Sequence, residues 1–303
     1  MTKIYDATRL WGVDYWAKEN KKEWAHSSGT YEWHLHKKAL QGKGYEILGA
    51  AIMPFPSTPD GTFLNANRQV GAVPGKETNL APIYAVQPNG GAKAVDELAV
   101  SDELYQSVGI KLWPYLGKFN LDDLLSNDSL VKYLKENKKS VLMHVGNGRE
   151  KITRPVFPDV RATPDVAIKC AMELNDIPVI IAHVARLCPR TLDLVRETPN
   201  AYLDLSGLTS LGRWKENGED GLPVDAGKTL ASLGPQAVLH RLVTEFGLED
   251  KLVFGTTWPF CSWWGIDVVD DVELIEGADL TPSIKEKLFW RNAFNCGLKP
   301  ELV

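Results

Sequence analysis

Residues Ser140–Glu150 read SVLMHVGNGRE, a short apolar run that reaches a histidine and then a loop with two glycines. This pattern is typical of a buried strand with His144 at its carboxyl end. A second segment, IPVIIAHVAR over Ile177–Arg186, has the same form, with a β-branched run that ends at His183. Helix-like sequence follows each strand, so we expect the strands to be parallel. Both imidazoles then lie on one rim of a sheet or barrel, where α/β enzymes have their active sites.

The composition excludes several classes of protein. The chain has 303 residues, 44% of them hydrophobic and 24% charged, as expected of a globular protein with a full core. A net charge of −5 argues against a nucleic-acid surface, and no apolar run is long enough to span a membrane or to act as a signal segment. The four cysteines lie far apart, which predicts neither a zinc knuckle nor a disulfide framework and favours a reducing cytoplasm.

Strand-like and helix-like segments alternate along the chain. The predicted strands are Lys3–Leu10, Tyr45–Met53, Ile83–Val86, Val108–Trp113, the runs before His144 and His183, Ala201–Ser206 and Lys251–Gly255. The predicted helices are Glu32–Leu40, Ala94–Leu104, Ser129–Lys135, Pro164–Leu174, Arg190–Glu197, Gln236–Phe246 and Ser283–Phe294. Because no GxGxxG follows the first strand, the alternation predicts a (β/α)8 TIM barrel rather than a doubly wound sheet. We see no repeat and no linker, so we expect one domain over residues 1–303.

Five stretches, taken in order, carry a family resemblance: VLMHVGNG, VIIAHVAR, AYLDLSG, KLVFGTTWPF and LFWRNAFNCGL. Together they resemble the amidohydrolase-related family of TIM-barrel proteins over nearly the whole chain. The resemblance implies that His144 and His183 are the histidines that end the family's fifth and sixth strands. It also matches Phe254–Pro259 to the eighth-strand motif FGSDWP, and Asn292 with Ala293 to the NA pair of the last helix.

The chain departs from the family at the places that bind metal. The family's first strand ends in HxH, two metal ligands, and here YDATRLWG has Thr8 and Leu10 in those places. The eighth-strand aspartate, which binds the metal or handles the proton of the attacking water, is replaced by Thr257. Leucine offers no lone pair and a neutral hydroxyl is a poor ligand, so two imidazoles remain where a catalytic zinc usually has three protein ligands. We therefore expect no tightly bound metal and no other cofactor.

An HxH does occur elsewhere in the chain, in the sequence WHLH, at His34 and His36. On a strand the two side chains would share a face, but only eight residues separate His36 from the strand expected at Tyr45. That connection is too short for the helix that a parallel crossover needs. In a helix the two histidines would point about 200° apart, so we do not expect them to share a metal.

The candidate catalytic residues are His144, His183 and Asp204. An imidazole with a pKa near about 6.5 is the natural general acid or base at neutral pH, so either histidine can take a proton from water while the other donates to an oxyanion. Hydrogen bonds that merely cap each strand are the alternative, but two histidines at adjacent strand ends favour catalysis. Asp204 on the seventh strand can replace the missing aspartate as proton acceptor, although DLSG is also a common strand-to-loop ending.

Cationic side chains near the same rim predict that the substrate is a carboxylate. Lys111 on the fourth strand can bind such a group or act as a base, unless it extends out to solvent. Arg149 and Arg186 lie in the loops after the two histidines, and their guanidinium groups suit bidentate capture of a carboxylate. Surface ion pairs are the competing interpretation for both arginines.

Aromatic residues at strand ends predict an apolar pocket. Trp113 and Trp258, with Thr257 beside the latter, are candidates to line it, although core packing explains the rings almost as well. Trp263 and Trp264 follow shortly after.

Three functional hypotheses are compatible with these residues. The favoured one is a metal-independent hydrolase of the amidohydrolase-related type, a lactonase or amidase acting on a small planar or aromatic acid through histidine general acid–base catalysis. The second is a decarboxylase or another lyase or isomerase acting on a similar acid in the same pocket. The third is a barrel without activity that binds a ligand or a protein partner. Copies of the chain can associate through the tryptophan-rich N-terminal region.

Overall fold

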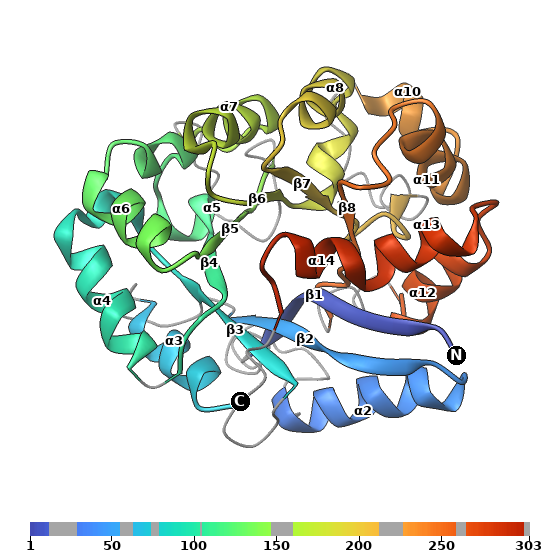
Figure 1. Cartoon of the computed structure of the whole chain (residues 1–303), viewed down its shortest axis with the longest axis horizontal. Helices are drawn as coiled ribbons and strands as arrows, with labels where there is room; N and C mark the ends of the chain where they lie inside the picture. Colours follow the sequence, from blue (N-terminus) through green and yellow to red (C-terminus); the bar gives the residue numbers. More distant parts are fainter. Residues whose placement is uncertain are drawn as a thin grey trace.

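The computed structural model describes residues 1–11, 29–54, 63–73, 79–103, 105–146, 160–211, 227–258 and 265–299. Eight parallel strands form one sheet in the order β1 to β8. They are β1 (Lys3–Trp11), β2 (Glu46–Pro54), β3 (Leu80–Ala85), β4 (Gly109–Leu112), β5 (Ser140–Met143), β6 (Val179–Ile181), β7 (Ala201–Asp204) and β8 (Leu252–Val253). The sheet closes where Ala7 N–H donates to Phe254 O at 2.9 Å and Leu10 N–H donates to Trp258 O at 3.0 Å. The predicted TIM barrel is confirmed (Figure 1).

Helices surround the strands in Figure 1. The α-helices are α2 (Gly29–Gly42), α3 (Leu64–Gly71), α4 (Ala92–Asp102), α5 (Pro114–Gly117), α6 (Asp128–Glu136), α7 (Pro164–Leu174), α8 (Pro189–Glu197), α10 (Lys228–Ala231), α11 (Pro235–Thr244), α12 (Val268–Glu276), α13 (Pro282–Glu286) and α14 (Asn292–Asn295). Tighter turns are η1 (Pro88–Gly90), η2 (Leu121–Leu124) and η3 (His183–Leu187), and η6 (Lys287–Arg291) is a π-helical turn between α13 and α14. Proline at the first position starts α7, α8, α11 and α13, where its missing N–H and fixed φ are no disadvantage.

The strands are buried on both faces, because side chains fill the barrel interior and helices cover its outside. All six residues of β3 and all four of β5 are buried, which explains their nearly continuous apolar sequences. This core holds the strand ends in place, and the loops that follow those ends carry the candidate site.

Two buried asparagines tie helices to strand ends. Asn292 in the final helix donates from Nδ2 to the carbonyl oxygens of Glu249 and Leu252, at 2.8 and 2.7 Å. Asn67 of α3 donates to Ala85 O at 2.9 Å and accepts from Ala85 N–H at 2.8 Å. The asparagine of the NA pair therefore holds the start of β8, which is a structural role.

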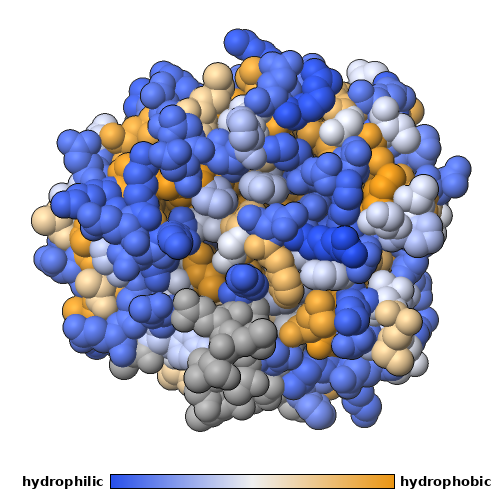
Figure 2. Space-filling view, viewed as in Figure 1, coloured by the Kyte–Doolittle hydropathy of each residue, from blue (hydrophilic) through white to orange (hydrophobic). Residues whose placement is uncertain are grey.

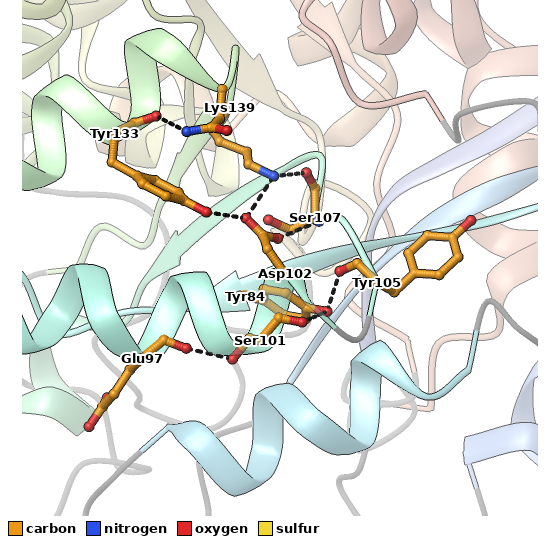
Figure 3. Close-up of polar contacts among 9 residues, drawn as sticks. Tyr84, Glu97, Ser101, Asp102, Tyr105, Ser107, Tyr133 and Lys139 are labelled. Carbon is orange, nitrogen blue, oxygen red and sulfur yellow. Dashed lines mark hydrogen bonds and ion pairs between the residues drawn. The ribbon is translucent and has the colours of Figure 1, made fainter.

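A charged cluster ties the barrel together where β4 and β5 begin, at the end opposite the two histidines. Lys139 Nζ lies 2.9 Å from Asp102 Oδ2 and donates to Ser107 O at 2.6 Å. Tyr133 donates its hydroxyl hydrogen to the same carboxylate at 2.6 Å, and the Ser107 N–H donates to its other oxygen at 2.7 Å (Figure 3). Because both charges of this nearly buried ion pair also make hydrogen bonds, the cluster is structural, and removing one charge would cost about 3–5 kcal/mol.

The surface shows no concentrated apolar patch on the face seen in Figure 2, where hydrophilic residues predominate and hydrophobic ones occur in small separate groups. The large exposed hydrophobic side chains among the described residues are Met1, Leu35, Val100, Met172 and Leu233. Within the same residues, every helix is too short or too polar to cross a membrane.

Asp271 on α12 makes the stability of the fold depend on pH. Burial, reinforced by the nearby carboxylates of Asp6, Asp270 and Asp204, raises its pKa to about 8 against the Thr209 hydrogen bond. A folded pKa above the unfolded value means that the contribution of this group to stability is largest below about pH 4 and is lost as the pH rises through about 8. We expect Asp271→Asn to remove a decline on the order of 2–4 kcal/mol in the free energy of unfolding between about pH 5 and pH 8.

Urea denaturation at the two pH values measures this difference. The matched control is Asp279→Asn, an exposed position that should keep the wild-type pH dependence. An Asp271→Asn protein that loses stability with pH as steeply as the wild type would contradict the prediction.

Candidate active site

His144 and His183 lie side by side at the carboxyl ends of neighbouring strands. His144 follows β5 and His183 follows β6, and the two strands are paired in register through Met143 and Ile181. The ring centroids are 4.9 Å apart with the planes nearly perpendicular, at 83°. Nε2 of His183 is 3.2 Å from Nδ1 of His144, within hydrogen-bond distance. The structure therefore brings together the two imidazoles that the sequence places at strand ends.

The backbone at His183 and the four residues after it has an unusual left-handed conformation. Residues His183–Leu187 have φ between +49° and +56°, and none of them is glycine. The left-handed region costs an L-residue roughly 1–2 kcal/mol, so this turn depends on the structure around it. Arg186 supplies part of that support, because its buried Nε–H donates to Val145 O at 2.7 Å in the loop after β5. This hydrogen bond therefore joins the turn that begins at His183 to the loop residue that follows His144.

Asp204 reaches the histidines through a serine. Ser206 donates its hydroxyl hydrogen to Asp204 Oδ2 at 2.8 Å, and the same hydroxyl oxygen lies 3.0 Å from Nδ1 of His183. The backbone N–H of Ser206 donates to Asp204 Oδ1 at 2.5 Å, and the hydroxyl of Thr8 is 3.4 Å from that oxygen. Burial raises the pKa of Asp204 to about 6, while the bonds to Ser206 and the Lys111 charge act in the opposite direction.

Ser206 is a site residue that the sequence analysis missed. The spacing of Ser206 in the sequence could have identified it. Asp204 and Ser206 are two residues apart at a strand end, and alternation directs both side chains to one face.

The first and eighth strands pack closely around Asp204. A Cβ atom on Gly255 would lie 2.0 Å from Thr8 Oγ1 and 2.9 Å from Asp204 Oδ1, so the position admits no side chain without a shift of the strands. Asp6 on β1 accepts from Thr256 twice, from the hydroxyl at 2.6 Å and from the N–H at 3.1 Å. The barrel therefore brings Thr8 into contact with Asp204. Thr8 occupies a position where the family resemblance implies a metal-binding histidine.

Aromatic rings and a buried cation border the histidine pair. Lys111 is only 1% exposed, and its ammonium lies 4.5 Å from the centroid of the Trp113 ring, an attractive cation–π geometry. The rings of Trp113 and Tyr115 lie 5.3 and 6.3 Å from that of His144. Desolvation, then the charges of Arg186, His144 and Lys111, lower the pKa of His183 well below its usual value. Lys111 thus points into the protein rather than out to solvent, and Tyr115 joins the candidate lining.

The remaining candidates for substrate binding lie in different surroundings. Thr257 is buried with φ +51°, and its N–H donates to Thr8 O at 3.1 Å. Trp258 is partly exposed, and its backbone N–H is bound to the Thr256 hydroxyl at 3.0 Å. The roles of Thr257, Trp258 and Arg186 in substrate binding stay predictions. Arg149, Trp263, Trp264 and most of the tryptophan-rich N-terminal region lie outside the described residues.

The WHLH sequence lies in helix α2 and forms no shared ligand pair. His34 is exposed, whereas His36 is buried with Nδ1 2.9 Å from Nη1 of Arg9. Desolvation and the charge of Arg9 lower the pKa of His36 well below its usual value, so its ring is neutral at pH 7. The helical geometry separates the two histidines, as expected from the short connection to β2.

Sequence comparison with protein families gives one decisive match. The amidohydrolase family model matches residues 58–294, which is most of the chain. The protein belongs to the amidohydrolase family. No curated protein matches its sequence.

Solved structures share the fold of this amidohydrolase at low sequence identity. An amidohydrolase from Burkholderia multivorans with bound HEPES has a TM-score of 0.68 at 14% identity, covering 99% of this chain and 100% of that one. The 5-carboxyvanillate decarboxylase of Sphingomonas paucimobilis has a TM-score of 0.65 at 10% identity, covering 99% and 100%. A probable 2-pyrone-4,6-dicarboxylic acid hydrolase from Acinetobacter baumannii with bound citric acid has a TM-score of 0.57 at 16% identity, covering 97% and 98%. These likenesses extend the fold assignment over the whole chain.

The described residues of this amidohydrolase do not fit the metal centre that the family resemblance implies. The 3.2 Å between Nε2 of His183 and Nδ1 of His144 would suit a shared ion, but a catalytic zinc usually has three protein ligands. Both oxygens of Asp204 contact Ser206, and the described residues contain no group of three or more His, Cys, Asp and Glu side chains placed to bind an ion. The donor set of the described chain is therefore too small.

We accordingly expect elemental analysis of protein purified without added metal to find far less than one equivalent of transition metal. Preparations with and without a chelator should have the same metal content and the same melting temperature. A bound metal would stabilise the folded state, so its removal by the chelator would lower the melting temperature. One tightly held equivalent, lost together with thermal stability in a His144→Ala His183→Ala protein, would contradict this expectation.

Proposed function

We propose that this amidohydrolase is a metal-independent hydrolase that opens a lactone or amide bond in a small planar or aromatic carboxylic acid. The observation that carries the proposal is the contact between His144 and His183 at 3.2 Å, linked to Asp204 and bordered by Lys111 and Trp113. Imidazoles move protons at neutral pH, and a buried ammonium beside them favours an anionic substrate.

Each group has a place in the reaction. Lys111 attracts the substrate carboxylate, and the flat ring of Trp113 offers a surface for a planar substrate. The imidazole pair takes a proton from water as its oxygen bonds to the scissile carbonyl carbon, and returns the proton to the leaving oxygen or nitrogen as that bond breaks. A lactone then yields a hydroxy acid, and an amide yields an acid and an amine.

Decarboxylation is the second candidate, because the same groups can supply a proton. Burial raises the pKa of Asp204 to about 6, so the chain from Asp204 to the histidines holds an exchangeable proton near neutral pH. In this reaction the carboxylate leaves as CO2 and the resulting carbanion takes a proton from the imidazole. In decarboxylation no water molecule attacks the substrate.

Product analysis on a panel of acids separates the candidates. The names of the compared proteins supply the first compounds to test, namely 2-pyrone-4,6-dicarboxylic acid and 5-carboxyvanillate. We expect ring opening that incorporates one oxygen from labelled water and releases no CO2. Release of CO2 supports the decarboxylase, and thermal stabilisation by an acid without turnover supports a binding protein. A His144→Ala protein controls for contaminating enzymes.

A further inference from the structure

We propose that Ser206 is a positioning residue that fixes which nitrogen of each imidazole carries hydrogen, and that it thereby makes Nε2 of His144 the proton acceptor of the site. The hydrogen positions follow from the described contacts together with the neutral state of His183. The catalytic consequence rests on the proposed function, because it requires a histidine to take a proton during turnover.

The chain of hydrogen bonds starts at Asp204. At pH 7.5, above its pKa of about 6, the Asp204 carboxylate is ionised and only accepts hydrogen bonds, so the hydroxyl of Ser206, 2.8 Å from Oδ2, must donate its single hydrogen to it. The backbone N–H of Ser206 donates to the other oxygen at 2.5 Å, which holds the carboxylate and the serine in one orientation. The Ser206 hydroxyl therefore has only acceptor capacity left for any further partner.

That partner is Nδ1 of His183, at 3.0 Å from the Ser206 hydroxyl oxygen. The carbonyl oxygen of Ser206 lies 3.3 Å from the same nitrogen, and a carbonyl oxygen can only accept. Two acceptors from one residue thus face Nδ1, so this nitrogen carries the hydrogen. Each contact leads to the same assignment independently of the other.

The assignment then passes to His144. Desolvation, then the charges of Arg186, His144 and Lys111, lower the pKa of His183, so the ring is neutral and, with hydrogen on Nδ1, its Nε2 has a lone pair. Nδ1 of His144, 3.2 Å away, must therefore donate to that lone pair. A neutral His144 with hydrogen on Nδ1 has its own lone pair on Nε2.

This arrangement suits a general base. When Nε2 of His144 takes a proton, the hydrogen on Nδ1 stays in place and still donates to His183, so the described bonds from His144 through His183 and Ser206 to Asp204 keep their directions. His183 is then a positioning partner for His144, and the two imidazoles are not equivalent. Removing the Ser206 hydroxyl leaves only the longer carbonyl contact to hold the hydrogen on His183.

Nitrogen NMR of ¹⁵N-histidine-labelled protein tests the assignment without any substrate. At pH 7.5 we expect the wild-type spectrum to show both His144 and His183 as the Nδ1–H tautomer, assigned with single His→Gln variants. Ser206→Ala should shift His183 toward a mixture of tautomers, and Ser206→Thr, which restores a hydroxyl, should restore the wild-type pattern. Ser232→Ala, an exposed serine on another element, is the matched control and should leave the spectrum unchanged.

Kinetics supplies the second readout. Ser206→Ala should lower kcat by roughly tenfold and change its pH profile, while KM stays within about a factor of two, because the serine does not bind substrate. Ser206→Thr should recover most of the rate, which a purely structural defect would not predict.

Failure of the hydrogen assignment and failure of the proposed function give different results. Hydrogen on Nε2 of His183 or on Nε2 of His144 in the wild-type protein would overturn the assignment whether or not the serine variants fold. Expected tautomers together with no hydrolysis of any tested acid would support the hydrogen assignment and overturn the proposed function.

Discussion

His144→Ala is expected to lower kcat by about 10²–10⁴-fold on the acid that the wild-type protein hydrolyses, because general acid–base groups contribute about that much. The ring lies at the end of a strand and is partly exposed, so its loss leaves the barrel core untouched. KM should change much less than kcat, since the cation assigned to substrate binding is Lys111. Steady-state kinetics and thermal melting on the same preparation measure both effects.

His34→Ala is the matched control for this experiment. His34 is exposed on α2 and takes no part in the site, so its removal should leave kcat unchanged. A His144→Ala protein that keeps the wild-type rate would remove this histidine from the chemistry.

Lys111→Met is expected to raise KM for an acidic substrate by about 10–100-fold, the equivalent of one lost hydrogen bond between charged groups. Methionine keeps much of the length of the side chain and its packing against Trp113, but it removes the charge. Thermal melting of the variant checks that the protein is still folded. KM for the carboxylate substrate and for its uncharged methyl ester should be measured side by side.

The comparison with the ester separates binding of the substrate carboxylate from a change in the shape of the pocket. The variant should lose affinity for the acid and not for the ester, and Lys132→Met on the exposed face of α6 should affect neither. An equal loss for acid and ester would show that the lysine shapes the pocket without binding a carboxylate.

The sequence predicted the barrel because local and global signals agree along most of the chain. Helix α7 has the predicted bounds, Pro164–Leu174, since proline starts it and the apolar pattern ends where it ends. The third strand begins earlier than predicted, at Leu80 instead of Ile83, because it continues through Pro82. Helices α3 and α12 were not predicted, since each follows a segment rich in turn residues or aromatic residues that hides where the helix begins.

The site was only partly predictable, for physical reasons that concern individual residues. Parallel strands with histidines at their ends must bring those ends together, so the contact between His144 and His183 could be expected. The link through Ser206 could not, because its hydroxyl has meaning only once the fold places it between an aspartate and an imidazole. The direction of Lys111 likewise depends on packing, since a lysine on a strand can point to either face.

The left-handed turn at His183–Leu187 has a consequence for heat tolerance. Glycine in place of Ala185 would relax the backbone by roughly 1 kcal/mol, since glycine adopts this conformation freely. The same freedom would let the imidazole swing away from its neighbour. Directed evolution for survival at higher temperature should therefore select glycine in this turn at the expense of turnover. Selection for turnover should keep the present residues without glycine.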